Sequence, residues 1–146
     1  MNGQVFWTVL SGVTVYVLGQ VFVKFVIDPI QAFYTLTGEV GHSLIVYANI
    51  YCNVPVCDKS ELREPHEAFR RLSGQLFVSA YAIPWYGLWA KLRFLPPRKD
   101  VQDAAEQLIG LSNGCLDTSD RSYDTNDKRA RKLERLLGLY PAEKAS

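Results

Sequence analysis

A run of 19 residues without a charged side chain, at positions 5–23, constrains this chain more than any other feature. Eleven of these residues are Val, Leu or Phe, and the apolar character resumes after Lys24 in residues 25–27. A helix of about 20 residues crosses the roughly 30 Å hydrocarbon core of a bilayer. On insertion scales, eleven strongly apolar residues contribute about −3 to −7 kcal/mol, with no charge at the bilayer centre to oppose them. The sequence therefore predicts a transmembrane anchor over residues 1–27.

Three other interpretations of this segment fit the residues less well. A cleaved signal peptide has a basic start and a small-residue cleavage site, but the chain begins Met-Asn-Gly-Gln and no A-x-A pattern follows the run. Residues 13–17 alternate as a strand would, yet an isolated strand cannot satisfy its backbone in lipid. A buried helix of a soluble core is the third alternative, but a chain of 146 residues has little else to wrap around such a helix. A membrane helix is favoured.

Charge is distributed unevenly along the chain. Residues 1–53 carry only Lys24, Asp28 and Glu39, whereas residues 54–146 carry the other 15 Lys and Arg and 13 Asp and Glu. No cation precedes the apolar run and several follow it, so the positive-inside bias predicts a single-pass protein with its C-terminal part in the cytoplasm. The net charge of +1 lacks the basic excess of nucleic-acid binders, and no nucleic-acid partner is expected.

Small residues recur on one face of the predicted anchor. Gly12 and Gly19 are seven positions apart, and Thr8 lies one turn before Gly12. Such residues allow another helix to approach closely. We predict helix packing through this row, either with a second copy or with the following segment, where Gly41 lies.

Residues 28–53 predict a second helix that begins with Asp28 as N-cap and Pro29 at the first position. Glu39 and His42 are three apart in its middle, so they are neighbours on the helix surface. An ionised carboxylate at bilayer depth costs about 3 kcal/mol. This favours a helix at the membrane edge over a second span, with a two-span hairpin as the alternative. The pair is a candidate polar site near membrane depth, or a plain surface hydrogen bond.

Residues 54–114 predict a polar linker and then helices separated by proline, in the cytoplasm or at the interface. Pro65 is expected to open the first helix, and the Ile83-Pro84 step to end or bend it. Pro96-Pro97 introduces the next helix, which is expected to end with Asn113-Gly114 as a C-terminal cap.

Between these prolines lies WYGLWAKLRFL, where aromatic rings stand beside cations. This combination is typical of segments in the lipid headgroup layer. The alternative is that the rings pack a small core while the cations face water. The residues that carry the interfacial prediction are Trp85, Tyr86, Trp89, Lys91 and Arg93.

Residues 115–146 predict a polar hinge at 117–128 and a C-terminal amphipathic helix capped by Asn126 or Asp127. Its apolar side consists of four leucines and its other face is basic, so it fits docking on its own domain, on a partner or on anionic lipid. The apolar side comprises Leu133, Leu136, Leu137 and Leu139, and the basic face Arg129, Arg131, Lys132 and Arg135.

Signatures of catalysis are weak throughout. Glu39-x-x-His42 has the spacing of di-metal bundles, but those sites need the motif twice, and the other histidine, His66, is not in a second copy. Cys52, Cys57 and Cys115 match neither a redox nor a zinc spacing, so ordinary thiols are expected. We expect no metal and no cofactor.

These observations predict an all-α protein, with an N-terminal transmembrane helix followed by a small bundle of amphipathic helices. The favoured function is a non-enzymatic, membrane-anchored protein that binds another protein, or assembles with itself, at the cytoplasmic membrane face. One alternative is a small oligomeric pore-forming or membrane-perturbing protein with two spans, in which Glu39 and His42 line a polar path. The other is a membrane-bound enzyme with a site assembled from Glu39, His42 and the aromatic segment.

Overall fold

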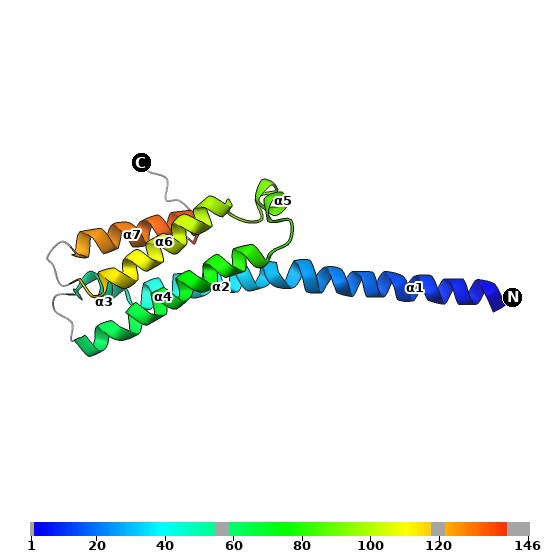
Figure 1. The fold of residues 1–146 in the computed structure, drawn as a ribbon, viewed down its shortest axis with the longest axis horizontal. Coiled ribbons are helices and arrows are strands. Elements are labelled where there is room, and N and C mark those ends of the chain that lie inside the picture. The colour runs from blue at the N-terminus through cyan, green and yellow to red at the C-terminus, as the bar shows by residue number, and fades with distance from the viewer. Residues whose placement is uncertain (1, 55–58, 118–121, 140–146) are drawn as a thin grey trace.

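The computed structural model describes residues 2–54, 59–117 and 122–139 (Figure 1). The protein is all-α, as predicted: it is 88% helical, and the described ranges contain no strand. In chain order the elements are α1 (Asn2–Phe22), the π-helical segment η1 (Val23–Ile27), α2 (Asp28–Val46), α3 (Ala48–Cys52), α4 (Lys59–Ala82), α5 (Tyr86–Lys91), α6 (Arg98–Gly114) and α7 (Ser122–Leu137).

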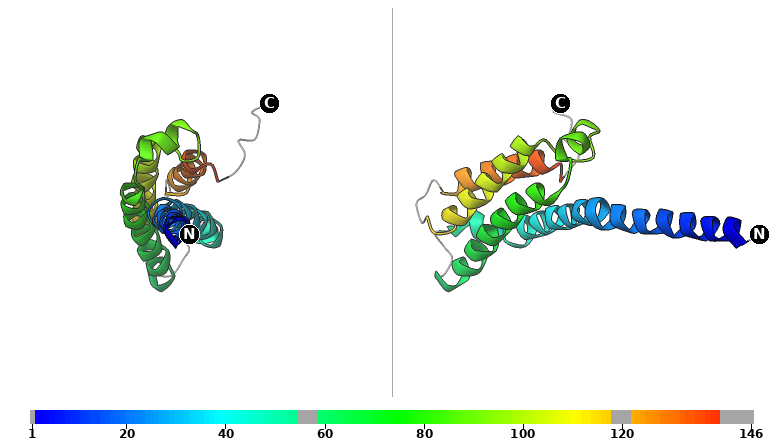
Figure 2. Two further views of the ribbon diagram at one scale, coloured as in Figure 1. Left: turned by 90° about the vertical axis from the view of Figure 1, so that its right-hand side faces the viewer. Right: turned by 45° about the vertical axis from the view of Figure 1, so that its right-hand side comes forward.

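The first three elements form one unbroken helix, Gly3–Val46, of 44 residues. At 1.5 Å per residue it is about 66 Å long. Its first half projects from the bundle in Figure 1 and in the right view of Figure 2, and every residue from position 3 to position 25 is exposed. Only 6% of its most apolar window is buried in the protein, and the helix is long and apolar enough to span a membrane.

Asp28 and Pro29 do not begin a new helix, contrary to the prediction. Proline has no N–H, and its ring clashes with the carbonyl four residues earlier, which here belongs to Phe25. The π turn directly upstream widens the backbone, because the Asp28 N–H donates to the carbonyl of Val23, five residues back. Since this widening lies where the proline ring needs room, the helix continues through Pro29.

The helices α2, α4, α6 and α7 pack into a bundle, with α4 between α2 and α6 and with α6 between α4 and α7. α2 and α6 run away from α1, whereas α4 and α7 return toward it (Figure 1). Each contributes side chains at three- and four-residue steps to one apolar core. The fully buried members include Phe33, Val40, Phe69, Leu72, Leu76, Leu108, Leu111 and Leu133.

α4 begins at Lys59, well before its predicted start at Pro65. Pro65 lies within the helix and is buried, as are Leu62 and Phe69 on the same face. The apolar face therefore extends one turn further upstream than predicted, and burial of these side chains offsets the hydrogen bond that the proline lacks. The predicted polar linker shrinks accordingly, and its residues 55–58 lie outside the described part of the chain.

α7 begins at Ser122, so the predicted caps Asn126 and Asp127 lie inside the helix. Part of the predicted hinge, residues 118–121, falls outside the described ranges. α7 docks on its own bundle through the buried Leu133 and Leu137. Its end is a Schellman motif, with Gly138 at φ +63° and the Leu139 N–H donating to the Glu134 carbonyl at 3.0 Å.

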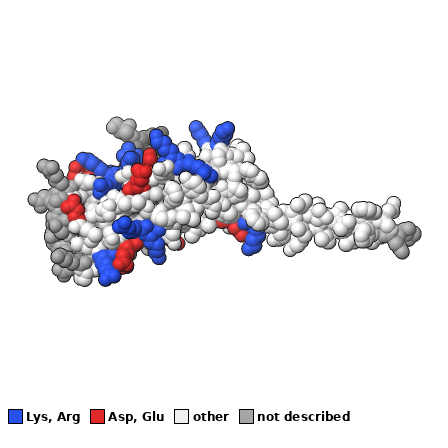
Figure 3. Space-filling view, in the orientation of Figure 1, with Lys and Arg blue, Asp and Glu red and all other residues white. Residues whose placement is uncertain are grey.

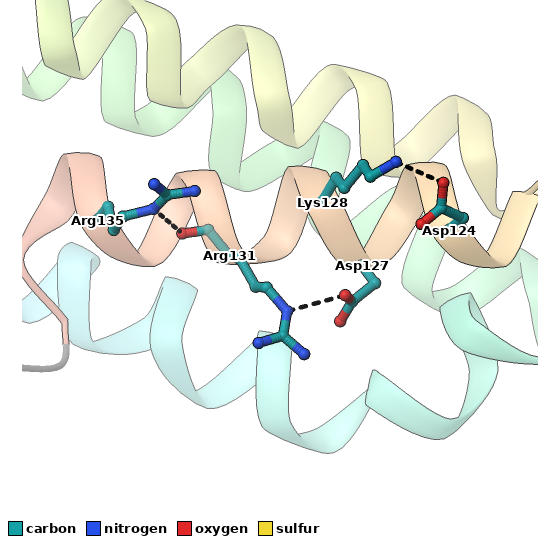
Figure 4. Close-up of polar contacts among 5 residues, drawn as sticks. All are labelled: Asp124, Asp127, Lys128, Arg131 and Arg135. Carbon is teal, nitrogen blue, oxygen red and sulfur yellow. Dashed lines mark hydrogen bonds and ion pairs between the residues drawn. The ribbon is translucent and has the colours of Figure 1, made fainter. Parts of the chain in front are cut away.

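Three cations of α7 have partners within the chain. Lys128 pairs with Asp124, and Arg131 with Asp127 at 2.8 Å, each one turn apart on the helix (Figure 4). Arg129 donates through Nη1 to the Gly110 carbonyl of α6 at 2.9 Å. The face predicted to be basic is therefore partly neutralised by the carboxylates of α7 itself.

α6 ends at Gly114, where the sequence predicts, but for a different physical reason. The glycine does not adopt the left-handed conformation of a C-terminal cap. It makes room for Asn126 of α7: a Cβ at Gly114 would lie 2.0 Å from the Asn126 Oδ1. Asn126 is fully buried and donates through Nδ2 to the Tyr51 carbonyl at 2.9 Å, so it ties α7 to α3 at this close approach.

Candidate membrane-facing site

The end of the bundle from which α1 projects is called here the anchor-proximal end. It contains the start of α2, residues 77–82 of α4, the segment 85–94 around α5 and the start of α6 (Figures 1 and 2). Two sets of interactions hold these parts together. The Tyr34 hydroxyl of α2 donates to the Phe94 carbonyl, and the Arg98 guanidinium lies 5.0 Å from the ring centroids of both Tyr81 and Tyr86.

α5 is a short helix flanked by two residues in the left-handed region. Trp85 precedes it at φ 51° and Arg93 follows it at φ 61°. Arg93 occupies the position that glycine favours in a Schellman motif. The Arg93 N–H donates to the Ala90 carbonyl at 3.1 Å, and the Phe94 N–H to the Trp89 carbonyl at 3.0 Å.

The five residues predicted to be interfacial are brought to this end, but they do not share one environment. Trp85 is 69% exposed, and Lys91 and Arg93 are exposed beside it. Trp89 is partly buried, and its Nε1 donates to the Pro84 carbonyl at 3.2 Å.

Tyr86 is not interfacial, which corrects the prediction. It is 1% exposed, and its hydroxyl donates to the Pro96 carbonyl at 2.8 Å. Burial raises the pKa of Tyr86 to about 12. The rings of this segment therefore divide between the two interpretations that the sequence left open: Tyr86 packs the core and Trp85 faces outward.

Sequence reasoning missed three apolar side chains around α5. Leu88, Leu92 and Phe94 are each more than half exposed. With Trp85, the two leucines form a stripe at positions i, i+3 and i+7, which is the signal that could have identified them. Phe77, Val78 and Tyr81 at the end of α4 are exposed as well, so an apolar surface continues from α5 onto α4.

Cations surround this surface. The sequence from position 68 to position 99 contains no Asp or Glu but six Lys and Arg, which are Arg70, Arg71, Lys91, Arg93, Arg98 and Lys99. The fold brings the last four to the anchor-proximal end. In Figure 3, basic side chains stand over the region of α5, whereas α1 shows no charge on the visible face.

Glu39 and His42 lie on α2 and are both exposed. They line a shallow pocket of about 360 Å³ with Tyr47 of the adjoining turn and Arg71 of α4. Glu39 follows Asp28 by eleven residues, or about 16 Å of helix, so the pair lies within the bundle and away from the apolar span. The described residues contain no group of three or more His, Cys, Asp or Glu that could hold a metal.

A larger groove of about 560 Å³ runs between α2 and α4. Its lining is mostly apolar and includes several small residues. The lining residues are Ala32, Thr35, Leu36, Glu39, Gly74, Gln75, Val78 and Ser79.

The residues predicted to pack helices separate into two places. A Cβ at Gly12 or Gly19 would meet nothing within 4 Å, and the Thr8 hydroxyl donates within α1 to the Gln4 carbonyl at 2.9 Å. Gly41 instead faces Leu139, with its Cβ position 3.3 Å from that side chain. Because α1 and α2 belong to one continuous helix, Gly41 cannot contact Gly12 or Gly19 of its own chain.

The thiols are not activated. Burial raises the pKa of Cys115 to about 11, and burial also raises the pKa of Cys52. The thiolate is the reactive form, so both are less nucleophilic than a free cysteine. The third cysteine, Cys57, lies outside the described residues.

Comparison with known proteins adds no constraint, since no family model, no curated protein and no solved structure matches this chain.

Proposed function

We propose that this protein is a single-pass membrane protein, in which the N-terminal helix tethers a helical bundle to the cytoplasmic face and the bundle binds another protein. The observation that carries the proposal is that every residue from position 3 to position 25 is exposed. Apolar surface of this extent is strongly unfavourable in water. A bilayer removes it from water without any change in the fold.

The two-span pore receives less support. Its second span would be α2, and α2 inserts Phe33, Val40 and Leu44 into the core that it shares with α4. Moving α2 into lipid would expose the partners of these side chains to water, at about 1.5–3 kcal/mol for each buried side chain. The enzyme alternative needs Glu39 and His42 beside the aromatic segment, but the pocket that this pair lines contains no residue of α5.

The topology is tested by labelling single cysteines from either side of sealed membrane vesicles. The three native cysteines are first replaced. A single cysteine is then introduced in turn near Asn2, at Asp28 or at Lys59. The proposal requires the cysteines at positions 28 and 59 to react from the cytoplasmic side. The cysteine near the N-terminus should react only from the opposite side. Reaction of Asp28 and Lys59 from opposite sides would support the hairpin and rule out the single span.

We assign the groove between α2 and α4 to the protein partner, because its apolar lining and small residues suit an apolar helix face. Gly74 lies in this groove, and a Cβ there meets nothing within 4 Å. A Cβ therefore fits at Gly74 without a clash, and Gly74→Leu places a larger apolar side chain in the groove.

Gly38→Leu is the matched control, since Gly38 is also helical and unobstructed but does not line the groove. Cross-linking from Ser79 in native membranes should yield a defined partner band that Gly74→Leu abolishes and Gly38→Leu retains. Equal bands in both variants would show that the partner does not use this groove.

A further inference from the structure

We propose that the anchor-proximal end of the bundle docks on the headgroup layer of an anionic bilayer, with α5 as the contacting element. This inference rests on the proposed tether and adds a second, separate membrane contact. It concerns the lipid surface, whereas the tether concerns the hydrocarbon core.

The length of the anchor places α5 near the level of the lipid headgroups. Residues 5–27 make about 34 Å of helix, enough for a hydrocarbon core of about 30 Å with some tilt. Lys24 reaches the headgroups along its aliphatic stem, and Asp28 marks the boundary. Tyr34, which holds the Phe94 carbonyl, follows Asp28 by six residues or about 9 Å of axis.

The headgroup region of each leaflet is about 5–8 Å thick. A bundle on an upright anchor would thus hold α5 at its outer edge. Transmembrane helices tilt by about 20° on average, and a tilt toward the side of α5 lowers that element into the layer. No unfolding or hinge is required.

The side chains at this end match the chemistry of that layer. Trp85, Leu88 and Leu92 offer an exposed apolar stripe, and tryptophan prefers the membrane interface. Lys91 and Arg93 stand beside the stripe. Phosphate groups of anionic lipid attract such cations with about 1 kcal/mol each.

Charge argues for lipid over a protein partner here. From position 68 to position 99 the chain has no carboxylate to pair with its own cations, and this stretch contains all of α5. The first acid beyond it is Asp100. The apolar surface also lies at the end of the bundle from which α1 projects (Figure 1), so a lipid surface is within reach in a tethered molecule.

Backbone strain at this end is consistent with a surface shaped for contact. Trp85 and Arg93 are the two non-glycine residues with positive φ among the described residues. Left-handed geometry at a residue with a side chain is unfavourable, and such residues cluster at functional positions. Here they aim the most exposed ring and a cation outward from the ends of α5.

The experiment uses two full-length single-tryptophan proteins in vesicles that contain lipids brominated in the upper acyl chain. One protein keeps Trp85 (Trp7→Phe, Trp89→Phe), and the other keeps Trp7 (Trp85→Phe, Trp89→Phe). Bromine quenching reports contact with lipid, and acrylamide quenching reports contact with water. Vesicles of phosphatidylcholine alone are compared with vesicles that also contain phosphatidylglycerol.

In vesicles with phosphatidylglycerol, Trp85 should be quenched by bromine and protected from acrylamide, and added salt should reverse both effects. In the Trp85 protein, Lys91→Gln and Arg93→Gly should each lower the ratio of docked to undocked protein about fivefold. Arg70→Gln is the control, because Arg70 is exposed on α4 but lies twelve residues, about 18 Å, before its end at Ala82. It should leave the ratio unchanged.

Trp7 separates this proposal from the tether. If bromine quenches Trp7 while Trp85 stays open to acrylamide in both vesicles, the tether stands and docking is refuted. Equal bromine quenching of Trp85 with and without phosphatidylglycerol would refute the role of the cations. If neither tryptophan is quenched by bromine, both proposals fail.

Discussion

Single residues of this protein adopt conformations that their side chains do not favour, and these positions carry the sharpest expectations. Arg93 is the clearest case, because its φ of 61° lies where glycine is preferred. Sequence patterns do not reveal such a residue, since nothing about Arg93 in its local sequence requires a left-handed backbone. The conformation belongs to the end of α5, where the Phe94 N–H donates back to the Trp89 carbonyl.

Arg93→Gly should stabilise α5, because left-handed geometry costs a residue with a side chain about 1–2 kcal/mol. Part of this gain is offset by the greater freedom of glycine in the unfolded chain, which leaves about 1 kcal/mol. Amide hydrogen exchange across α5 measures the change. Lys91→Gly, within the helix, is the matched substitution and should lower protection by about 1 kcal/mol. Equal effects of the two variants would contradict the assignment of Arg93.

Gly114 is a packing glycine, and the sequence suggested a capping role instead. Gly114→Ala should destabilise the bundle by about 1–3 kcal/mol, as overpacking does, because its Cβ meets a buried Asn126 that is bonded to the Tyr51 carbonyl. Gly38→Ala should stabilise it by up to about 1 kcal/mol. Denaturant titration in detergent compares the two, and a neutral Gly114→Ala would show that Asn126 moves aside freely.

At the scale of elements, apolar periodicity was a better guide to the helices than the positions of the prolines were. Apolar side chains that recur at three- and four-residue steps, among them Phe69 and Leu76 in α4 and Leu108 in α6, are buried. Proline misled at Pro29 and Pro65, where a π turn and burial of the ring allow the helix to continue. The prediction at Pro84 was right, since α4 ends at Ala82. Local sequence does not contain the tertiary contacts that distinguish these cases.

The attachment of α5 should weaken in alkali. Tyr86 anchors α5 to the Pro96 carbonyl, and burial raises its pKa from 10 to about 12. The unfolded chain therefore loses this proton first. The contribution of Tyr86 is full below pH 10 and declines as the pH rises toward 12.

A fluorescence titration of Trp85 against acrylamide should record this release, and Tyr86→Phe should remove that part of the pH dependence. The variant loses one hydrogen bond, worth about 1 kcal/mol, at every pH. An identical alkaline profile in the variant would assign the transition to another group.

At the scale of the whole molecule, the division into an apolar rod and a charged bundle was predictable from the charge asymmetry alone. The candidate site was predictable only in part. Trp85, Lys91 and Arg93 were identified from local composition, but Leu88 and Phe94 were not. The convergence of α4, α5 and the start of α6 beside the anchor depends on how helices pack, and no local pattern specifies that.

Removal of residues 1–23 should leave the bundle folded, because α1 contributes no side chain to its core. The shortened chain should show helical circular dichroism and a cooperative thermal transition in detergent-free buffer. It should also self-associate reversibly through the apolar surface around α5, and Leu88→Gln with Leu92→Gln should reduce this. Loss of the thermal transition would show that the anchor is part of the folding unit.

Because no break separates α1 from α2, the orientation of α1 is coupled to the orientation of the bundle. In the proposed tethered protein, the continuous helix turns as one body, so the bundle takes the angle that the membrane segment takes. Thicker bilayers make such segments stand more upright, and thinner ones make them lean. Bilayer thickness would thereby set how closely the bundle approaches the membrane plane.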